Sequence, residues 1–360
     1  MYYYFAPMEG ITGYIYRRVY DAFYPGLDRY YIPFIVPKEK KCLSAKERDD
    51  VLPEHNCGTT AIPQIMTNKA EEFLRIAKFL CQEYGYTKIN LNLGCPSKTV
   101  VSKKRGSGFL TMPDHLKKFL DEVCNGIAAF GVDLSVKTRI GKDSPDEFLY
   151  LLDIFAQFPL SELIVHPRVQ ADYYGNRPHK EAFAQAYQVF ANSNCQLCYN
   201  GDLFCVSDYL ELCEEFPNLK AVMMGRGLLK NPMLADEIKV RENGGTYKQD
   251  RKTIILRRFQ SEEIEEAERK RRYTMYQRMQ KEYLAVLSGD KNVLFKMKEL
   301  WFYMCQDFTE PQRYWKKMKK AQNLSDFERA VNALCTEQRL LNNLSGETGT
   351  KSNKGKTDDL

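Results

Sequence analysis

The chain has 360 residues, of which 44% are hydrophobic and 28% are charged, and its formal net charge is +6. This length allows one large domain and a smaller one, and so small a net charge gives only a weak preference for polyanionic partners. No apolar run approaches the roughly 20 residues that a membrane span needs, which argues against an integral membrane protein.

The cysteines and the first residues predict a reducing compartment. The eleven cysteines are scattered, and most lie in apolar segments, which is typical of reduced thiols. Residues 2–8 have neither the basic start nor the apolar length of a signal peptide. We therefore expect a cytoplasmic, monomeric protein without a disulfide framework.

Strand-like and helix-like patterns alternate along the first two thirds of the chain. Helical periodicity recurs between the strands, for example in 70–81, 113–129, 145–158 and 205–216. The eight expected strands are 2–8, 29–36, 60–66, 87–94, 133–140, 161–166, 196–200 and 221–225. This alternation predicts a (β/α)8 barrel, the TIM-barrel fold, over residues 1–240. A doubly wound open sheet is the alternative, but residues 6–10 (APMEG) do not form the glycine-rich turn that such a sheet usually has.

The remainder of the chain has a different composition. Residues 241–252 lose apolar periodicity and contain two consecutive glycines, which predicts a linker. The segments 253–287 and 291–305 are helical in pattern, so we expect a smaller all-helical domain over 253–340. Residues 341–360 are polar and are expected to be a disordered tail.

Polar residues and glycines gather where the expected strands end. In (β/α)8 enzymes this is the end of the barrel that carries the active site. Glycines after the seventh and eighth strands would let backbone N–H groups approach a phosphate, although either glycine alone could simply end a strand. The strand-end residues are Pro7, Met8, Glu9, Gln64, Asn92, Cys95, Lys137, Arg139, His166, Asn200, Gly201, Asp202, Gly225 and Arg226.

Lys137 narrows the choice of ligand. A lysine that points into a barrel mouth needs an anion to offset its desolvation, and reduced flavin carries negative charge on its ring. Gln64 has both a donor and an acceptor for the amide-like edge of that ring. Lys137 alone could also be a Schiff-base lysine or part of an ion pair. Together with Gln64, His166 and the two glycine sites, it favours a flavin.

The sequence resembles the tRNA dihydrouridine synthases. The most specific match is NLGCPSKTVVSKKRGSG at 92–108, and the segment to about residue 340 matches the family's C-terminal domain more loosely. Further matches are APMEGIT at 6–12, VKTR at 136–139, VHPR at 165–168, YNGD at 199–202 and MGRG at 224–227. The chain departs from the family at Gly13, where Asp is usual, and at Pro167, where Gly is usual.

The resemblance implies an FMN enzyme that reduces the C5–C6 double bond of uridine in tRNA, with NADPH or NADH as the reductant and no metal. Hydride would pass from N5 of FMN to C6, and Cys95 would donate the proton to C5. Asn92 would hold the uracil, while Arg139 and Tyr174 would face the RNA. The residues implied for FMN are Pro7, Met8, Gln64, Lys137, His166, Asn200, Gly201, Asp202, Gly225 and Arg226.

The reaction itself explains why a thiol suits the position of Cys95. A thiol with a pKa near 8.5 is mostly protonated at neutral pH, yet it can release its proton to a developing enolate. Cys95 stands between Gly94 and Pro96, before a loop that we expect to be mobile. Cys195 and Cys198 would point to opposite faces of a strand, so we assign them no function.

Three basic runs accompany the expected site. Each alone is typical of a solvated surface, but together they favour RNA binding through phosphate neutralisation. The first contains Lys98, Lys103, Lys104 and Arg105; the second spans 269–272; the third contains Lys316, Lys317, Lys319 and Lys320. The alternative function is an FMN barrel that reduces a small molecule, like dihydroorotate or dihydropyrimidine dehydrogenases, which would not need a basic helical domain.

Overall fold

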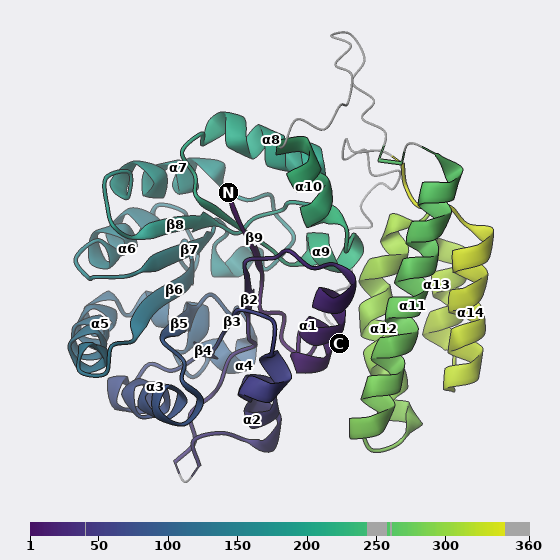
Figure 1. Ribbon diagram of the computed structural model, residues 1–360. Coiled ribbons are helices and arrows are strands. Elements are labelled where there is room, and N and C mark those ends of the chain that lie inside the picture. The colour runs from purple at the N-terminus through teal and green to yellow at the C-terminus, as the bar shows by residue number, and fades with distance from the viewer. Residues whose placement is uncertain (40, 243–257, 260, 343–360) are drawn as a thin grey trace.

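The computed structural model describes residues 1–39, 41–242, 258–259 and 261–342. Nine parallel strands form one sheet in the order β3-β2-β1-β9-β8-β7-β6-β5-β4. Because β3 and β4 are consecutive in the chain, the sheet closes into a barrel (Figure 1). The strands are β1 (Tyr2–Phe5), β2 (Arg29–Tyr31), β3 (Ala61–Ile62), β4 (Gln64–Ile65), β5 (Lys88–Leu93), β6 (Asp133–Arg139), β7 (Glu162–His166), β8 (Gln196–Tyr199) and β9 (Ala221–Met224). The predicted (β/α)8 class is confirmed.

The ninth strand arises because Pro63 divides the expected third strand. Proline has no N–H to donate, so the ladder is interrupted at this position. Before Pro63, Ile62 pairs with β2, and after it, Gln64 pairs with Asn90 of β5. The Pro63 carbonyl still accepts from the Asn90 amide at 2.9 Å. One chain segment thus joins both edges of the sheet.

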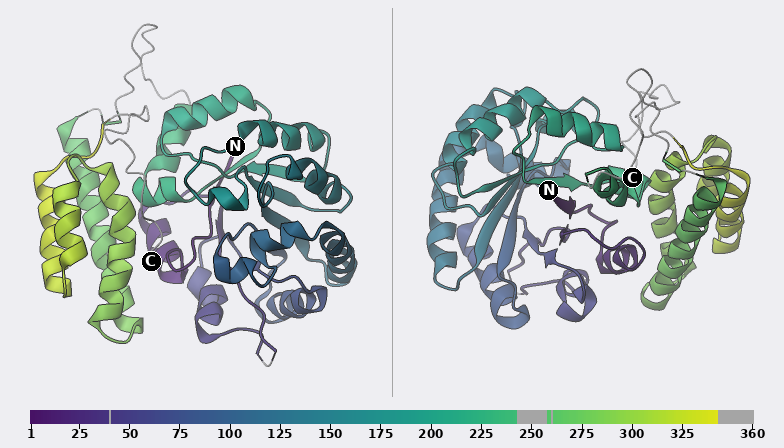
Figure 2. Two further views of the ribbon diagram at one scale, coloured as in Figure 1. Left: turned by 180° about the vertical axis from the view of Figure 1, so that it is seen from behind. Right: turned by 45° about the horizontal axis from the view of Figure 1, so that its top comes forward.

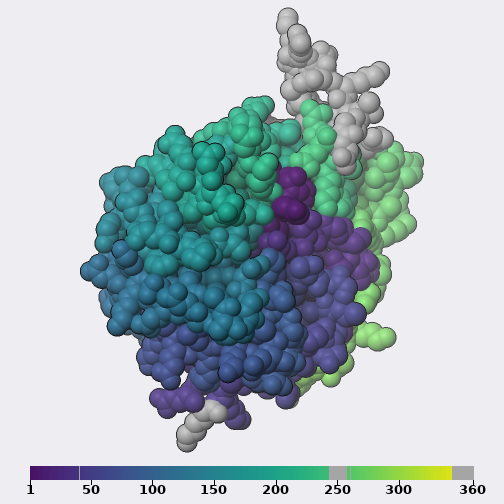
Figure 3. All heavy atoms as spheres, turned by 60° about the vertical axis from the view of Figure 1, so that its left-hand side comes forward, coloured from purple at the N-terminus to yellow at the C-terminus, as the bar shows by residue number. Residues whose placement is uncertain are grey.

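Helices cover the outside of the barrel (Figure 1), and on the face shown in Figure 3 segments that follow one another in the chain lie side by side. The predicted segments 113–129, 145–158 and 205–216 correspond to α5, α6 and α8. The helices are α1 (Tyr14–Phe23), α2 (Ala45–Val51), α3 (Ala70–Tyr84), α4 (Lys98–Val101), α5 (Pro113–Ala128), α6 (Glu147–Phe155), α7 (Lys180–Val189), α8 (Val206–Glu215), α9 (Arg226–Lys230) and α10 (Leu234–Glu242), with 3-10 turns η1 (Pro53–Asn56), η2 (Gly106–Thr111) and η3 (Gln170–Asp172). None of the described helices has both the length and the hydrophobicity that a membrane span requires.

A buried carboxylate closes the N-terminal end of the barrel. Glu162, at the start of β7, is 2% exposed and accepts hydrogen bonds from Tyr4 at 2.8 Å and from Tyr31. Arg29 and Gln196 each donate to the same carboxylate at 3.1 Å. Glu162, Arg29 and Gln196 are each the first residue of a strand, so the opposite end of the barrel is the one left for a ligand.

The departure at Gly13 has a local compensation. Gly13 precedes α1 and has no side chain to cap the helix. The Asp50 carboxylate, from α2, accepts from the Tyr14 amide at 2.6 Å and lies where a Gly13 side chain would crowd it, with 3.2 Å between Oδ1 and the missing Cβ. A carboxylate from another helix therefore does the work of an N-cap residue.

The C-terminal helices form a separate layer against one side of the barrel, next to α1, in each view of Figures 1 and 2. They are α11 (Glu262–Val286), α12 (Asp290–Met304), α13 (Gln312–Lys320) and α14 (Leu324–Glu337), with η4 (Cys305–Asp307) between the second and third. Helix α11 packs on α1, and α12 packs on α9. An all-helical C-terminal part is confirmed; its predicted boundaries stay a prediction, since most of 241–252 and of 341–360 lies outside the described residues.

A buried ionic network joins the two parts. Arg272 of α11 is 0% exposed and donates to Glu268 at 2.9 Å and to Asp307 at 2.8 Å. Arg258 donates to the same Asp307 at 2.6 Å and also to Glu237 of α10. Glu268 in turn accepts from the Tyr24 hydroxyl of α1 at 2.8 Å. Because each buried charge has partners on another element, the helices are held firmly to the barrel.

This network corrects the interpretation of the basic run 269–272. Arg272 is buried in the interface, and Arg271 donates to the Phe23 carbonyl of α1 and pairs with Glu268. Arg269 pairs with Glu265 at 2.8 Å and is only 16% exposed. Lys270 alone is well exposed. The run therefore serves the contact between the helices and the barrel rather than forming an RNA-binding surface.

We predict that Arg272→Met lowers the free energy of unfolding by about 3–5 kcal/mol, because it leaves Glu268 and Asp307 buried with too few partners. Lys270→Met, two residues away on the exposed side, should change it by less than about 0.5 kcal/mol. Urea unfolding followed by circular dichroism measures both. Equal effects of the two substitutions would contradict the importance of the network.

Candidate active site

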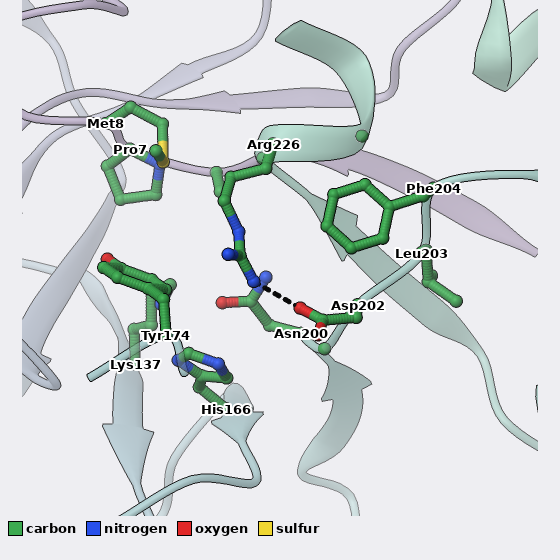
Figure 4. Close-up of a pocket in the computed structure, with 14 residues that line it drawn as sticks. Pro7, Met8, Lys137, His166, Tyr174, Asn200, Asp202, Leu203, Phe204 and Arg226 are labelled. Carbon is green, nitrogen blue, oxygen red and sulfur yellow. Dashed lines mark hydrogen bonds and ion pairs between the residues drawn. The ribbon is translucent and has the colours of Figure 1, made fainter. Parts of the chain in front are cut away.

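A pocket opens at the C-terminal ends of β1, β6, β7, β8 and β9 (Figure 4). Every residue predicted to bind the cofactor lines it except Gln64, and Tyr174 lines it as well. The lining residues are Ala6, Pro7, Met8, Lys137, His166, Tyr174, Asn200, Gly201, Asp202, Leu203, Phe204, Gly225, Arg226 and Gly227.

Positive charge dominates this pocket. Arg168 binds both oxygens of the Asp202 carboxylate, at 3.0 and 2.5 Å, and Arg226 reaches the same carboxylate at 2.5 Å (Figure 4). Lys137 adds a third cation from β6. Asp202 thus pairs with two arginines, and Lys137 adds a further positive charge to the pocket, an excess that suits an anionic ligand.

The protonation states follow from burial and from these charges. Burial, with the neighbouring Arg139 guanidinium, lowers the pKa of Lys137 to about 8, so most of the lysine is still charged at pH 7. Burial also lowers the pKa of His166 well below its ordinary value, and the surrounding cations lower it further. His166 is therefore neutral, and the positive charge resides on the lysine and the arginines.

Tyr174 forms an aromatic wall of the pocket. Its ring stacks on His166 with the centroids 6.1 Å apart and the planes 29° apart. The guanidinium carbons of Arg226 and Arg139 lie 4.8 and 5.5 Å from its centroid. The side chain is 48% exposed, so it is within reach of both the pocket and the solvent. A planar, electron-rich group could stack beside it.

The glycines at the pocket are needed for packing as well as for access. A Cβ on Gly201 would lie 2.1 Å from the Tyr199 hydroxyl, and a Cβ on Gly227 would lie 2.0 Å from the Leu203 carbonyl. A Cβ on Gly225 would be less crowded, since it would lie 3.2 Å from the Ala6 Cβ and from the Met8 sulfur. Among the described residues, none accepts from the Gly201 or Asp202 amides. These N–H groups are available to an anion at the pocket.

Comparison with known proteins identifies the family. The family model of the dihydrouridine synthases matches residues 4–337. The chain belongs to the dihydrouridine synthase family. A tRNA-dihydrouridine(16) synthase of Pseudomonas putida is 30% identical over 248 residues, which cover 67% of this chain and 74% of the relative. A probable tRNA-dihydrouridine synthase of Staphylococcus aureus is 27% identical over 284 residues, which cover 74% and 81%.

Cys95, which the sequence predicts to be the acid, follows β5 and is half-buried. The Asn92 side-chain oxygen accepts from the Gly94 and Cys95 amides, both at 3.0 Å. The Cys95 carbonyl accepts from the Ser107 amide at 3.1 Å and from its hydroxyl at 2.8 Å. The loop that was expected to be mobile is thus folded back as α4 and η2, and Gly106 (φ +54°) allows it to approach Cys95 closely.

Gln64 lies beside the pocket rather than in it. Its side chain is 0% exposed; its amide nitrogen donates to Asn90 and its oxygen accepts from Asn92, both at 2.7 Å. These amides form a buried chain from β4 to the Cys95 turn. Contact of Gln64 with a flavin can use one amide hydrogen and the second lone pair of its oxygen, and contact of Asn92 with uracil can use one amide hydrogen; these roles stay predictions.

The residues expected to face RNA divide into two groups. Arg139 is 1% exposed and donates to the carbonyls of Gly94, Val169 and Tyr173 at 2.8–3.0 Å, so it holds two loops together instead of facing the solvent. Arg105 pairs with Glu72 at 3.3 Å, and its side chain is 17% exposed, so it is only partly accessible to RNA. Lys98, Lys103 and Lys104 are exposed on the loop after Cys95, and Tyr174 is exposed at the pocket.

Sequence reasoning missed Arg168 as a site residue. It is 1% exposed and contacts Asp202, His166 and the Asn176 carbonyl. The quoted motif VHPR contains it, and residues two apart on extended backbone share a side, which was the available signal. Pro167 between them has its own contact, because its carbonyl accepts from the His179 amide at 2.6 Å.

We predict that Cys95 resists alkylation by iodoacetamide at pH 7. Burial raises the pKa of the Cys95 thiol, and only the thiolate reacts. Its rate should rise steeply as the pH is raised, which peptide mapping by mass spectrometry measures, with the exposed Cys57 as an internal reference. A Cys95 that reacts at pH 7 as fast as Cys57 would be inconsistent with a protonated thiol.

Proposed function

We propose that this protein is a tRNA-dihydrouridine synthase that holds FMN in the pocket, accepts electrons from NADPH or NADH, and reduces the C5–C6 double bond of a uridine in tRNA. Relatives named for this activity match most of the barrel. The observation that carries the proposal is the arrangement at one end of the barrel, where a cationic pocket lies beside a protonated cysteine. A cytoplasmic, monomeric protein is part of the same prediction.

The pocket fits a flavin mononucleotide in three respects. Arg226 is exposed enough to exchange its Asp202 partner for a phosphate, and the Gly201 and Asp202 amides are available to the same group. Tyr174 and His166 offer a stacked aromatic surface for a planar ring. Lys137 would supply the charge that a reduced, anionic ring requires.

Cys95 would act as the acid beside this pocket. Asn92, three residues before Cys95, is aligned in the sheet with Lys137 of β6, which lines the pocket. Arg139 links the two sides, since its guanidinium binds the Gly94 carbonyl and lies over the Tyr174 ring. The pairing of β5 with β6 and the contacts of Arg139 thus position both the Cys95 turn and the wall of the pocket.

The reaction adds a hydride at C6 and a proton at C5 of uracil. Bound reduced FMN would supply the hydride. Cys95 would hold its proton on Sγ until negative charge develops on the uracil, and burial of the thiol keeps it protonated at neutral pH. Asn92 would keep the Cys95 backbone in place through its two accepted hydrogen bonds.

RNA would reach the site over exposed lysines. Lys98, Lys103 and Lys104 surround the Cys95 loop, and α13 carries a second exposed group at Lys316, Lys317, Lys319 and Lys320. Phosphate neutralisation by such residues would provide much of the affinity, and the target uridine must leave its stack to reach the pocket. We expect binding to weaken steeply with salt.

We predict that FMN binding weakens as the pH is raised from about 7 to about 9. The folded pKa of Lys137 is about 8, below its ordinary value, so its charge is present below that pH and lost above it. The dissociation constant, measured by quenching of flavin fluorescence, should rise by up to about tenfold per pH unit.

Lys137→Met should bind FMN more weakly throughout and without this pH dependence, while Lys137→Arg, which keeps its charge, should also show none. A parent protein whose FMN affinity is flat over this range would exclude a direct role for the lysine.

We predict that Cys95→Ala retains its fold, its FMN and its reduction by NADPH. Oxidation of the reduced flavin by unmodified tRNA should slow by roughly 100- to 10,000-fold, the usual contribution of a positioned general acid. Anaerobic single-turnover kinetics measure this step. Cys195→Ala is the matched control, because that thiol is buried and lies outside the pocket. If Cys95→Ala reoxidised at the parent rate, the proton would have another source.

A further inference from the structure

Arg168 lies behind the pocket: it contacts the lining residues His166 and Asp202 but does not line the pocket itself. Its guanidinium donates to both Asp202 oxygens at 3.0 and 2.5 Å, and its Nε donates to the Asn176 carbonyl at 2.7 Å. Nη1 also lies 3.0 Å from Nε2 of His166. The side chain is 1% exposed, so its hydrogen bonds are made to the protein rather than to water.

Only one assignment of donor and acceptor is possible for the contact between Arg168 and His166. A guanidinium is always protonated and has donors but no acceptor, so Nε2 of His166 must accept. The proton of a neutral imidazole then resides on Nδ1. We infer that Arg168 is a positioning residue that fixes His166 as the Nδ1–H tautomer and so makes this histidine a hydrogen-bond donor to the ligand.

The charges around His166 support a neutral ring. Lys137 and Arg139 face it from β6, Arg168 from the loop after β7, and Arg226 from α9, while Asp202 is already bound by two arginines. An imidazolium would add a positive charge to this group and would present a donor to the Arg168 donor. Both effects exclude the doubly protonated form at neutral pH.

The Nδ1–H group has no acceptor within the described part of the protein. Its ring face is covered by Tyr174, so only the ring edge remains for hydrogen bonding. Since His166 lines the pocket, the acceptor is a water molecule when the pocket is empty and a group of the bound molecule when that molecule displaces the water. A carbonyl oxygen, a ring nitrogen or a phosphate oxygen would satisfy it, and a donor group in the same position would not. This step rests on the proposed function only for the identity of FMN as the ligand.

Nuclear magnetic resonance of the ¹⁵N-histidine-labelled full-length protein tests the tautomer directly. The chain has four histidines, so the His166 signals can be assigned by their loss in His166→Gln. In the parent at neutral pH, Nδ1 should give the signal of a protonated nitrogen and Nε2 that of an unprotonated one. A parent His166 that is protonated on Nε2, or on both nitrogens, overturns the inference without any variant.

Substitutions separate this role from a merely structural one. Arg168→Met removes the donor and should populate the Nε2–H tautomer, with FMN binding weakened at least about threefold to tenfold, as expected for a lost hydrogen bond. Arg168→Lys keeps a donor and should restore both properties towards those of the parent. Arg177→Met, which alters an exposed arginine of the same loop, should change neither. An unchanged tautomer in Arg168→Met would overturn the inference.

If Arg168→Met does not fold, the parent and Arg168→Lys still decide the result, because Arg168→Lys must retain Nδ1–H. No tRNA is involved in these measurements. An Nδ1–H tautomer together with no FMN binding would support the role of Arg168 in setting the tautomer and overturn the proposed cofactor.

Discussion

A guanidinium withdrawn from water must recover its hydrogen bonds from the protein, and this requirement shapes both functional parts of the molecule. Arg17, Arg139, Arg168 and Arg272 are each at most 1% exposed. Arg139 ties the Cys95 turn to the Tyr174 loop, and Arg168 ties that loop to Asp202. Because a buried arginine that loses a partner is costly, these loops are held in one arrangement before any ligand arrives.

The same requirement explains why a basic run in the sequence can be mistaken for an RNA-binding surface. Net charge and basic runs describe how many cations a chain has, not how many remain in solvent. The run 269–272 resembled an RNA-binding surface, but Arg271 donates to the Phe23 carbonyl of α1 across the interface, and Arg272 pairs with Glu268 and with Asp307 of η4 inside the helical part. Glu265 and Glu268 lie three or four residues from these arginines on α11, but Asp307 and the Phe23 carbonyl are distant in the chain, so the sequence does not show that Arg271 and Arg272 face the interface.

The fold and most of the residues that line the pocket could be predicted from the sequence, because both depend on the periodic pattern of strands and helices. Strand endings converge at one end of a parallel barrel, so Lys137, His166, Asn200 and Arg226 could be expected together before any coordinates. The division at Pro63 followed from its missing N–H, yet the eight-strand prediction passed over it. Pairings such as Gln64 with Asn90, or Arg168 with Asp202, depend on three-dimensional register and could not be derived. Deleting the helical part would not be a clean test of the small-molecule alternative, because Glu237 would lose its Arg258 partner and the side of α1 that packs on α11 would be exposed.

Product analysis with the intact protein avoids that difficulty and tests the central claim most directly. The protein, FMN and NADPH would be incubated with unmodified tRNA, or with free uracil and orotate, and the products analysed by mass spectrometry after nuclease digestion. The account predicts that specific uridines of the tRNA gain the mass of two hydrogen atoms while the free pyrimidines stay unreduced. Unaltered tRNA together with a reduced free pyrimidine would contradict it and establish a small-molecule reductase instead.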